Sequence, residues 1–196
     1  MNRPLVIRPW HRTVFFLAAL FPSALFAAQT VLNFDDVSAP GPGVVSIPAG
    51  YGGVNWAVNM GIWGFDQSPY LPQSPPNRVL FNRNFESGVA ESLVSFINGP
   101  KIFDGAYFSG QDNVQLNLYS GQTLVATSGV LSLGTGSGPF FLQSGYAGPV
   151  DMVGIVGTRG AFAMDNFTFE TVPEPSTFVL AALGAVAVLA ACRRLS

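Results

Sequence analysis

The sequence predicts an all-β fold, an antiparallel and jelly-roll-like β-sandwich, for residues 29–171. Short segments there alternate apolar and polar side chains, which is the two-residue period of a half-buried strand. Glycine and proline recur between these segments, as turns require. No stretch repeats apolar side chains at 3.6-residue spacing over three turns, so we expect no helical core. A signal-peptide helix and a single transmembrane helix are expected outside this domain.

The first half of the domain predicts strands separated by long loops. Residues 30–35 alternate and open the domain, and residues 54–58 give the next strand. Residues 37–51 lie between them and are rich in proline and glycine, so we expect a loop. Residues 67–77 contain four prolines, which cannot donate to a sheet ladder, and predict a long irregular connection. Residues 79–81 give a short strand after it.

The second half predicts a denser series of strands. Residues 114–119 and 123–126 flank the turn Ser120-Gly121-Gln122 and indicate a β-hairpin. The other expected strands are residues 92–97, 102–108, 129–133, 139–143, 150–156 and 161–169. About eight to ten short strands with turns between them favour two packed antiparallel sheets. A closed barrel of the same strands is the alternative architecture.

Residues 1–28 have the three parts of a secretory signal peptide. The positive region is made of Arg3, Arg8, His11 and Arg12. An apolar run spans residues 14–26, and the small pair Ala27-Ala28 follows it. This order predicts export through the Sec translocon and cleavage by signal peptidase after Ala27 or Ala28. An uncleaved N-terminal anchor is the alternative.

The C-terminus, residues 172–196, carries a second set of address signals. A proline-flanked segment comes first and consists of Val172, Pro173, Glu174, Pro175 and Ser176. Neither proline donates a backbone N–H, so we expect a stiff, extended and accessible segment. The apolar residues 177–192 predict a transmembrane helix. The basic pair Arg193-Arg194, within residues 193–196, predicts a cytoplasmic tail.

These three parts, in this order, resemble the PEP-CTERM sorting signal of Gram-negative bacteria that make extracellular polysaccharide. The resemblance implies an exosortase as partner, a membrane enzyme that cuts near the Pro-Glu-Pro segment and releases or transfers the protein. The wholly apolar residues 178–191 would make a helix of about 21 Å, against a hydrocarbon core of about 30 Å. So short a span suits a temporary anchor in the inner membrane. A permanent anchor with a proline-rich stalk is the alternative.

The composition of residues 29–171 limits the reactions and binding sites that the domain can support. The one histidine, His11, and the one cysteine, Cys192, lie in the address segments. The domain therefore lacks the imidazole and thiol groups of catalytic triads and zinc sites, and we expect no enzymatic activity. Four basic and ten acidic residues between positions 29 and 171 give a net charge of −6, which argues against nucleic-acid binding. A glycoside hydrolase that uses Glu86 and Glu91 is the least favoured option.

Acidic residues on the first and last strands are candidates for a structural calcium site, because calcium takes carboxylate and carbonyl oxygens. They are Asp35, Asp36 and Asp165, with Asp151 as a further candidate. Calcium would offset the absence of disulfides in the domain. The alternative is that Asp35-Asp36 simply ends a strand and that Asp165 begins a turn.

Four segments resemble uncharacterised exported domains that precede this sorting signal. They are Asn33-Phe34-Asp35-Asp36, Tyr51-Gly52-Gly53-Val54-Asn55-Trp56, Phe103-Asp104-Gly105-Ala106-Tyr107-Phe108 and Met164-Asp165-Asn166-Phe167-Thr168-Phe169. The last segment is also similar to the closing strand of jelly-roll carbohydrate-binding modules, in which acids on the first and last strands often hold calcium.

Sugar binding would use exposed aromatic rings, because pyranose C–H groups stack on electron-rich ring faces. Trp63 and Tyr70 are the candidates, since they lie in loop-rich sequence outside any clean alternation. Burial is the alternative use of both rings. Trp56 alternates with Val54 and Val58, which predicts a place in the core.

The sequence thus indicates an exported protein of the cell surface or extracellular matrix, associated with exopolysaccharide or biofilm. We expect a structural or binding component. A calcium-stabilised carbohydrate-binding module is the alternative function.

Overall fold

The computed structural model describes residues 28–65, 67–81, 91–134, 138–157 and 161–172, together with Gly184. The predicted signal peptide up to Ala27, Glu86, the segment from Pro173 to Ser176, the predicted transmembrane helix and Arg193-Arg194 lie outside the described residues. Within the described ranges, no helix has the length and apolar character needed to cross a membrane.

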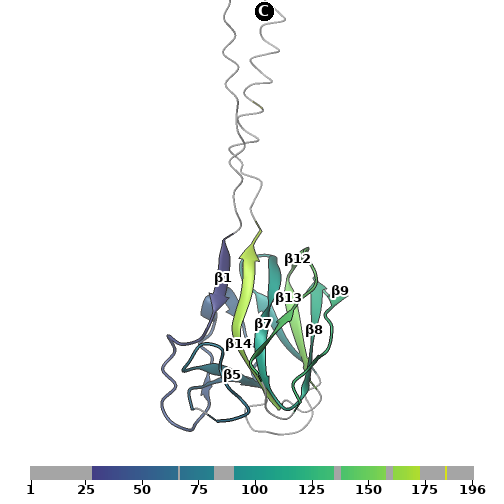
Figure 1. Ribbon diagram of the computed structural model, residues 1–196. Helices are drawn as coiled ribbons and strands as arrows, with labels where there is room; N and C mark the ends of the chain where they lie inside the picture. The colour runs from purple at the N-terminus through teal and green to yellow at the C-terminus, as the bar shows by residue number, and fades with distance from the viewer. Residues whose placement is uncertain are drawn as a thin grey trace, which may run out of the picture.

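The described strands divide between two antiparallel sheets that share one apolar core, which confirms the predicted β-sandwich (Figure 1). The first sheet contains β1 (Gln29–Leu32), β2 (Val45–Ser46), β4 (Met60–Trp63), β5 (Arg78–Phe81), β7 (Lys101–Gly110), β11 (Phe140–Gln143), β12 (Pro149–Val150) and β14 (Phe162–Thr171). The second contains β3 (Val54–Asn55), β6 (Glu91–Phe96), β8 (Asn113–Ser120), β9 (Thr123–Thr127), β10 (Leu131–Ser132) and β13 (Met152–Gly157). A short 3-10 helix, Tyr51–Gly53, precedes β3.

β14 is the strand that joins the parts of the first sheet. One of its edges pairs with β7 along most of its length. The other edge pairs with β5 near the start of β14 and with β1 near its end. The register with β7 shifts on both sides of Thr168, and Asn166 has a positive φ of 49° there. Such bulges re-aim side chains, which matters for the sites described below.

Phenylalanine side chains fill the space between the sheets. The most deeply buried are Phe34, Phe103, Phe108, Phe162 and Phe167, each 2% exposed or less. The ring centroid of Phe167 lies 4.6 Å from that of Phe103 and 5.3 Å from that of Trp56, so the half-buried Trp56 ring packs against the core. This core and all the described sheet pairings lie within residues 28–172, so this part of the chain contains the contacts needed to fold by itself.

The outer face of the first sheet is covered over only part of its area. Trp63, Leu80 and Ala163 form a second, smaller apolar cluster on that face. The segment from residue 67 to residue 77 lies over the sheet beside this cluster, where Ser109 Oγ donates a 2.7 Å hydrogen bond to the carbonyl oxygen of Leu71.

Some strands depart from the sequence-based expectation for physical reasons. The alternation of apolar and polar residues does not reveal β4, because all four of its residues are buried and no polar residue alternates with them. The expected strand 30–35 ends at Leu32, since Phe34 has a positive φ of 62°. β2 lies inside the expected loop 37–51, and Asp151 divides the expected strand 150–156 into β12 and β13.

Replacing Phe167 by alanine should lower the free energy of unfolding by about 3–5 kcal/mol, because a fully buried ring leaves a cavity when it is removed. Urea denaturation of residues 28–172, followed by tryptophan fluorescence, measures the change. Phe65→Ala is the matched control: Phe65 is 47% exposed, so the loss should stay below about 1 kcal/mol. Equal losses in the two variants would contradict the central position of Phe167.

Candidate functional site

Asp165 is a buried carboxylate in β14, 2% exposed, on the side of the sheet that the 67–77 segment covers. Its Oδ2 accepts hydrogen bonds from the backbone N–H of Ser74 at 2.7 Å and from Ser74 Oγ at 3.2 Å. Its Oδ1 accepts from the backbone N–H of Asn166 at 2.7 Å. Burial raises the pKa of the Asp165 carboxyl to about 6, and the negative charge of Asp35 adds to the increase.

Asp35 fastens the same segment at its other end. Its Oδ1 accepts a 3.0 Å hydrogen bond from the backbone N–H of Asn77. The side-chain amide of Asn77 donates in turn to the carbonyl oxygens of Phe34 and Val37, at 2.6 and 2.7 Å. Asp165 and Asp35 therefore hold residues 74–77 between the last strand and the turn that follows the first.

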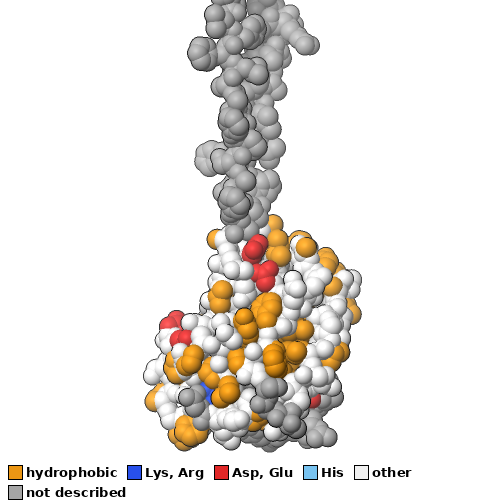
Figure 2. Space-filling model, in the orientation of Figure 1, with side chains coloured by type: hydrophobic (Ala, Val, Ile, Leu, Met, Phe, Trp, Pro, Cys, Tyr) orange, Lys and Arg blue, Asp and Glu red, His pale blue; other side chains and the backbone are white. Residues whose placement is uncertain are grey.

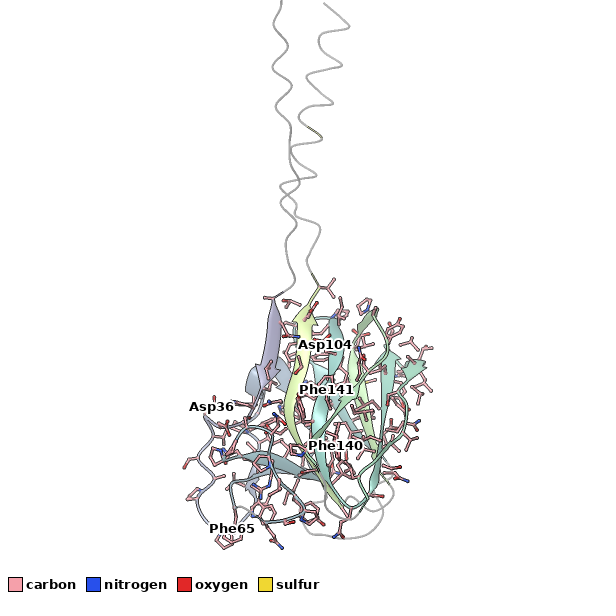
Figure 3. The ribbon with its side chains drawn as sticks, viewed as in Figure 1. Asp36, Phe65, Asp104, Phe140 and Phe141 are labelled. Atoms are coloured by element: carbon pink, nitrogen blue, oxygen red, sulfur yellow. The ribbon has the colours of Figure 1, made fainter. Side chains whose placement is uncertain are left out.

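Two of the three predicted calcium ligands, Asp35 and Asp165, fasten the two ends of the same short segment, residues 74–77. Asp36 is exposed, and its Oδ1 accepts a 2.6 Å hydrogen bond from the hydroxyl of Tyr51 (Figure 3). Asp151 instead accepts a 2.7 Å hydrogen bond from the backbone N–H of Gly121. In the part of the chain that the structure describes, no group of three or more His, Cys, Asp or Glu side chains gathers in a metal-binding arrangement.

The two aromatic residues predicted to bind sugar lie in or against the small outer cluster. Trp63 is 6% exposed, and its Nε1 donates a 3.1 Å hydrogen bond to the carbonyl oxygen of Pro42. The guanidinium carbon of Arg78 lies 4.7 Å from the Trp63 ring centroid, within cation–π range. Tyr70 is half-buried and packs against the same cluster. Burial removes the Trp63 ring from the surface, so this ring offers no open face for stacking.

Glu91 belongs to the second sheet and is engaged with its neighbours there. Its Oε1 accepts hydrogen bonds from Asn117 Nδ2 at 2.9 Å and from the Tyr119 hydroxyl at 2.8 Å. The bond to Glu91 raises the pKa of the Tyr119 hydroxyl. Glu86, the predicted second carboxylate of a glycosidase pair, lies outside the described residues.

The uncovered part of the first sheet presents a different group of side chains, which we term the β7–β11 face: Asp104, Tyr107, Phe141 and Gln143. Phe141 pairs with Tyr107 across the two strands, and antiparallel partners point to the same side of a sheet. Phe141 is 41% exposed, and its ring centroid lies 5.0 Å from that of Tyr107. Hydrophobic side chains gather in the middle of the surface in Figure 2, below two acidic groups, and Figure 3 shows Asp104 and Phe141 in this region.

A pocket of about 290 Å³ adjoins this face. Its lining residues are Ile102, Asp104, Gln143, Ser144, Gly145, Tyr146 and Ala147. It exists because β11 ends at Gln143 and the chain next pairs with β7 only in β12, where Pro149 lies opposite Ile102. The intervening loop supplies four of the lining residues, and it stays joined to β7 through the backbone N–H of Ser144, which donates a 2.7 Å hydrogen bond to the carbonyl oxygen of Asp104.

Sequence reasoning missed Phe141, although one signal for it was present. Phe140 and Phe141 are adjacent in an expected strand, and successive strand residues point to opposite faces. One of these two rings therefore had to lie on the outer face, provided that the strand was part of a sandwich. Both rings are partly exposed, at 42% and 41%.

The chain enters and leaves the sandwich side by side. β1 and β14 are antiparallel partners, with Gln29 opposite Glu170 (Figure 1). The backbone N–H of Thr171 donates a 3.3 Å hydrogen bond to the carbonyl oxygen of Ala28. Both address segments therefore join the domain at the same edge.

A protein-family model, described as the PEP-CTERM protein-sorting motif, matches residues 171–194. The chain carries a PEP-CTERM sorting motif. This match confirms the signal that the sequence predicted, and it begins at the last residue of β14. The PEP-CTERM motif marks an exported protein that an exosortase sorts and that a C-terminal membrane anchor holds before processing.

Two solved structures are similar to the PEP-CTERM chain, whereas no curated protein matches it. The first is a DUF4465 family protein from Bacteroides caccae, with 10% identity and a TM-score of 0.46, over 74% of this chain and 100% of that one. The second is a mutant of a family 29 carbohydrate-binding module, with 12% identity and a TM-score of 0.43, over 74% of this chain and 92% of that one. Neither likeness bears on function.

The raised pKa of Asp165 should make the domain less stable as the pH rises. Its carboxyl has a pKa of about 6 in the folded state against an ordinary 3.8, so between these values the folded state binds the extra proton. The free energy of unfolding should therefore fall by about 2 kcal/mol between pH 4 and pH 7 through this group alone. Urea titrations of the wild type and of Asp165→Asn at each pH isolate the effect. A difference between the two proteins that stays constant with pH would contradict it.

Proposed function

We propose that this protein is an exosortase substrate whose β-sandwich is released intact from the inner membrane and acts, without catalysis, at the cell surface or in the extracellular matrix. We further propose that it associates there with exopolysaccharide in a biofilm. The single observation that carries the proposal is the position of the two address signals relative to the strand ends. β1 starts at Gln29, just after the predicted signal-peptidase site, and β14 ends at Thr171, the first residue of the matched motif.

Removal of both signals would leave the sandwich unchanged. Cleavage after Ala27 or Ala28 retains all of β1, and cleavage within residues 172–176 retains all of β14. The pairing of these two strands is therefore preserved in the processed product. A module that loses no core residue on processing, and at most the hydrogen bonds from Thr171 to Ala28, is suited to work after release.

Until processing, the same geometry keeps the sandwich close to the membrane. Six residues, 172–177, join Thr171 to the wholly apolar run. Even fully extended, six residues span at most about 21 Å. An exosortase at the membrane surface would therefore meet the Pro-Glu-Pro segment next to the edge where β1 and β14 pair.

The chemistry of the domain supports a binding or structural role over catalysis. His11 and Cys192 belong to the two address segments, so the released module carries neither imidazole nor thiol. Asp35 and Asp165 accept hydrogen bonds that fasten a loop, and Glu91 accepts two within the second sheet.

Processing can be tested on intact masses of the protein recovered from cells and medium. In the producing bacterium the main product should begin at Ala28 or Gln29 and end within residues 172–176. Glu174→Ala should leave most of the protein as membrane-bound precursor. Glu170→Ala changes an acid just outside the motif and should be processed normally. A wild-type protein that keeps its C-terminus through Ser196 in every fraction would refute release.

Calcium binding is a second candidate property, and the acidic pair favours it. Asp35 and Asp165 supply the hard oxygen atoms that calcium prefers. A cation beside them would relieve the unfavourable burial that raises the pKa of Asp165. Asp36 is less suited, because it is exposed and its side chain bonds to Tyr51 instead of to residues 74–77.

Saturating calcium should raise the melting temperature of residues 28–172 by about 8 °C at one hundred times the Kd, because a ligand that binds only the folded state stabilises it by mass action. Calorimetry at pH 7 with calcium or magnesium measures the shift. Asp165→Asn should abolish it, whereas Asp36→Asn should retain it. A melting temperature that calcium leaves unchanged would dismiss the metal site.

A further inference from the structure

We propose that the β7–β11 face binds a neutral polysaccharide chain, with Phe141 and Tyr107 stacking on its pyranose rings and Asp104 and Gln143 bonding to its hydroxyl groups. The inference rests on the proposed function, which places the released module among exopolysaccharide. It assigns binding to residues other than Trp63 and Tyr70, the two that the sequence indicated.

The Phe141 ring has the placement that a stacking surface needs. Gly105 lies opposite Gln143 on β7, and a Cβ atom added to Gly105 would come within 2.8 Å of Phe141 Cζ. The ring therefore leans over the glycine into space that a side chain would otherwise occupy. Phe141 remains 41% exposed in this position, and it contacts Tyr107 at 5.0 Å between centroids. Pyranose C–H groups are attracted to such ring faces by the aromatic quadrupole.

Polar groups converge next to the two rings. Asp104 and Gln143 line the pocket of about 290 Å³ together with Ser144 and Tyr146. A carboxylate accepts hydrogen bonds from sugar hydroxyls, and an amide both donates and accepts. Apolar ring surface combined with a few convergent polar groups is typical of sites that fix the orientation of a ligand.

Asp104 reaches the mouth of the pocket because of a backbone irregularity. Phe103 and Gly105 pair with the adjacent residues Phe169 and Thr168, so Asp104 is the extra residue of a bulge in β7. Bulges commonly re-aim a side chain in this way. Gln29 Nε2 donates a 3.0 Å hydrogen bond to Asp104 Oδ2, which holds the carboxylate on the outer side of the sheet.

The charge of this surface selects among polysaccharides. The Asp104 carboxylate lies at the pocket, and residues 29–171 carry a net charge of −6. Both negative charges disfavour the binding of a strongly acidic polysaccharide. β11 is at one end of the strand order in the first sheet, so a long neutral chain can continue past it without meeting another strand of that sheet among the described residues.

The test is affinity electrophoresis of purified residues 28–172 in gels that contain mixed-linkage β-glucan, hydroxyethylcellulose, glucomannan, galactomannan or dextran. At least one of these polymers should retard the wild type. Phe141→Ala should weaken that binding by about tenfold, because the stacking ring is lost. Phe141→Tyr keeps the ring and should bind as the wild type does, and Asp104→Asn should weaken binding to a smaller extent.

Phe65→Ala is the matched control. Phe65 is a similarly exposed phenylalanine, at 47%, and Figure 3 shows it at the far end of the module from Asp104 and Phe141. Its removal should leave retardation unchanged. Thermal melts of each variant show whether the fold is intact, and Asp104→Asn decides the question if Phe141→Ala unfolds.

Three results would overturn the assignment. The first is that no polymer of the panel retards the wild type. The second is that Phe141→Ala and Phe65→Ala weaken polymer binding equally. The third is a dimer in sedimentation that Phe141→Ala abolishes, which would make the face a contact between copies of this chain. Processing is measured separately in cells. If the protein is processed but binds no polymer, only the proposed polysaccharide site is refuted. If the module binds a polymer but its C-terminus is never cut, only the proposed release from the membrane is refuted.

Discussion

The pairing of β14 with β7, β5 and β1 is the contact on which the rest of the structure depends. β14 contributes Phe162 and Phe167 to the core, and it carries Asp165 on the opposite face. It is also the last of the described strands, so the first sheet is complete only when Thr171 is in place. The sorting motif begins at this same residue, and the order of the chain therefore places the processing signal directly after the completed fold.

Two carboxylates decide how the outer face of that sheet is divided. Burial of Asp165 is unfavourable for its charge, but fixed hydrogen bonds from Ser74 and Asn166 offset part of that effect. Together with the bond from Asn77 to Asp35, they hold the 67–77 segment on one part of the sheet. Trp63 is buried in the covered part, whereas Phe141 remains exposed in the open part. The position of this segment therefore determines both which part of the sheet is covered and which part stays exposed.

The sequence predicted strands well wherever one face of the strand is exposed to solvent. β6 and β8 alternate between buried and more exposed residues, and both lie where the alternation placed them. The sequence did not predict β4, because the outer cluster covers its second face and the strand therefore lacks the alternating polar residues that mark a solvent-exposed face. The sequence predicted the acidic residues of the first and last strands as one group. In the structure, Asp35 and Asp165 bond to the same segment, residues 74–77, whereas Asp36 bonds to Tyr51.

The sorting motif and the all-β class were determined by the sequence alone, because both are local properties: a proline-flanked acid before an apolar run, and a two-residue apolar period between glycines. The tertiary structure decided which rings are open, which carboxylates are neighbours and where the pocket lies. These depend on which loop covers which part of a sheet and on a bulge between distant strands, and neither is expressed in the spacing of nearby residues. Trp63 and Phe141 are both aromatic residues of expected surface or strand segments, and only their packing partners distinguish them.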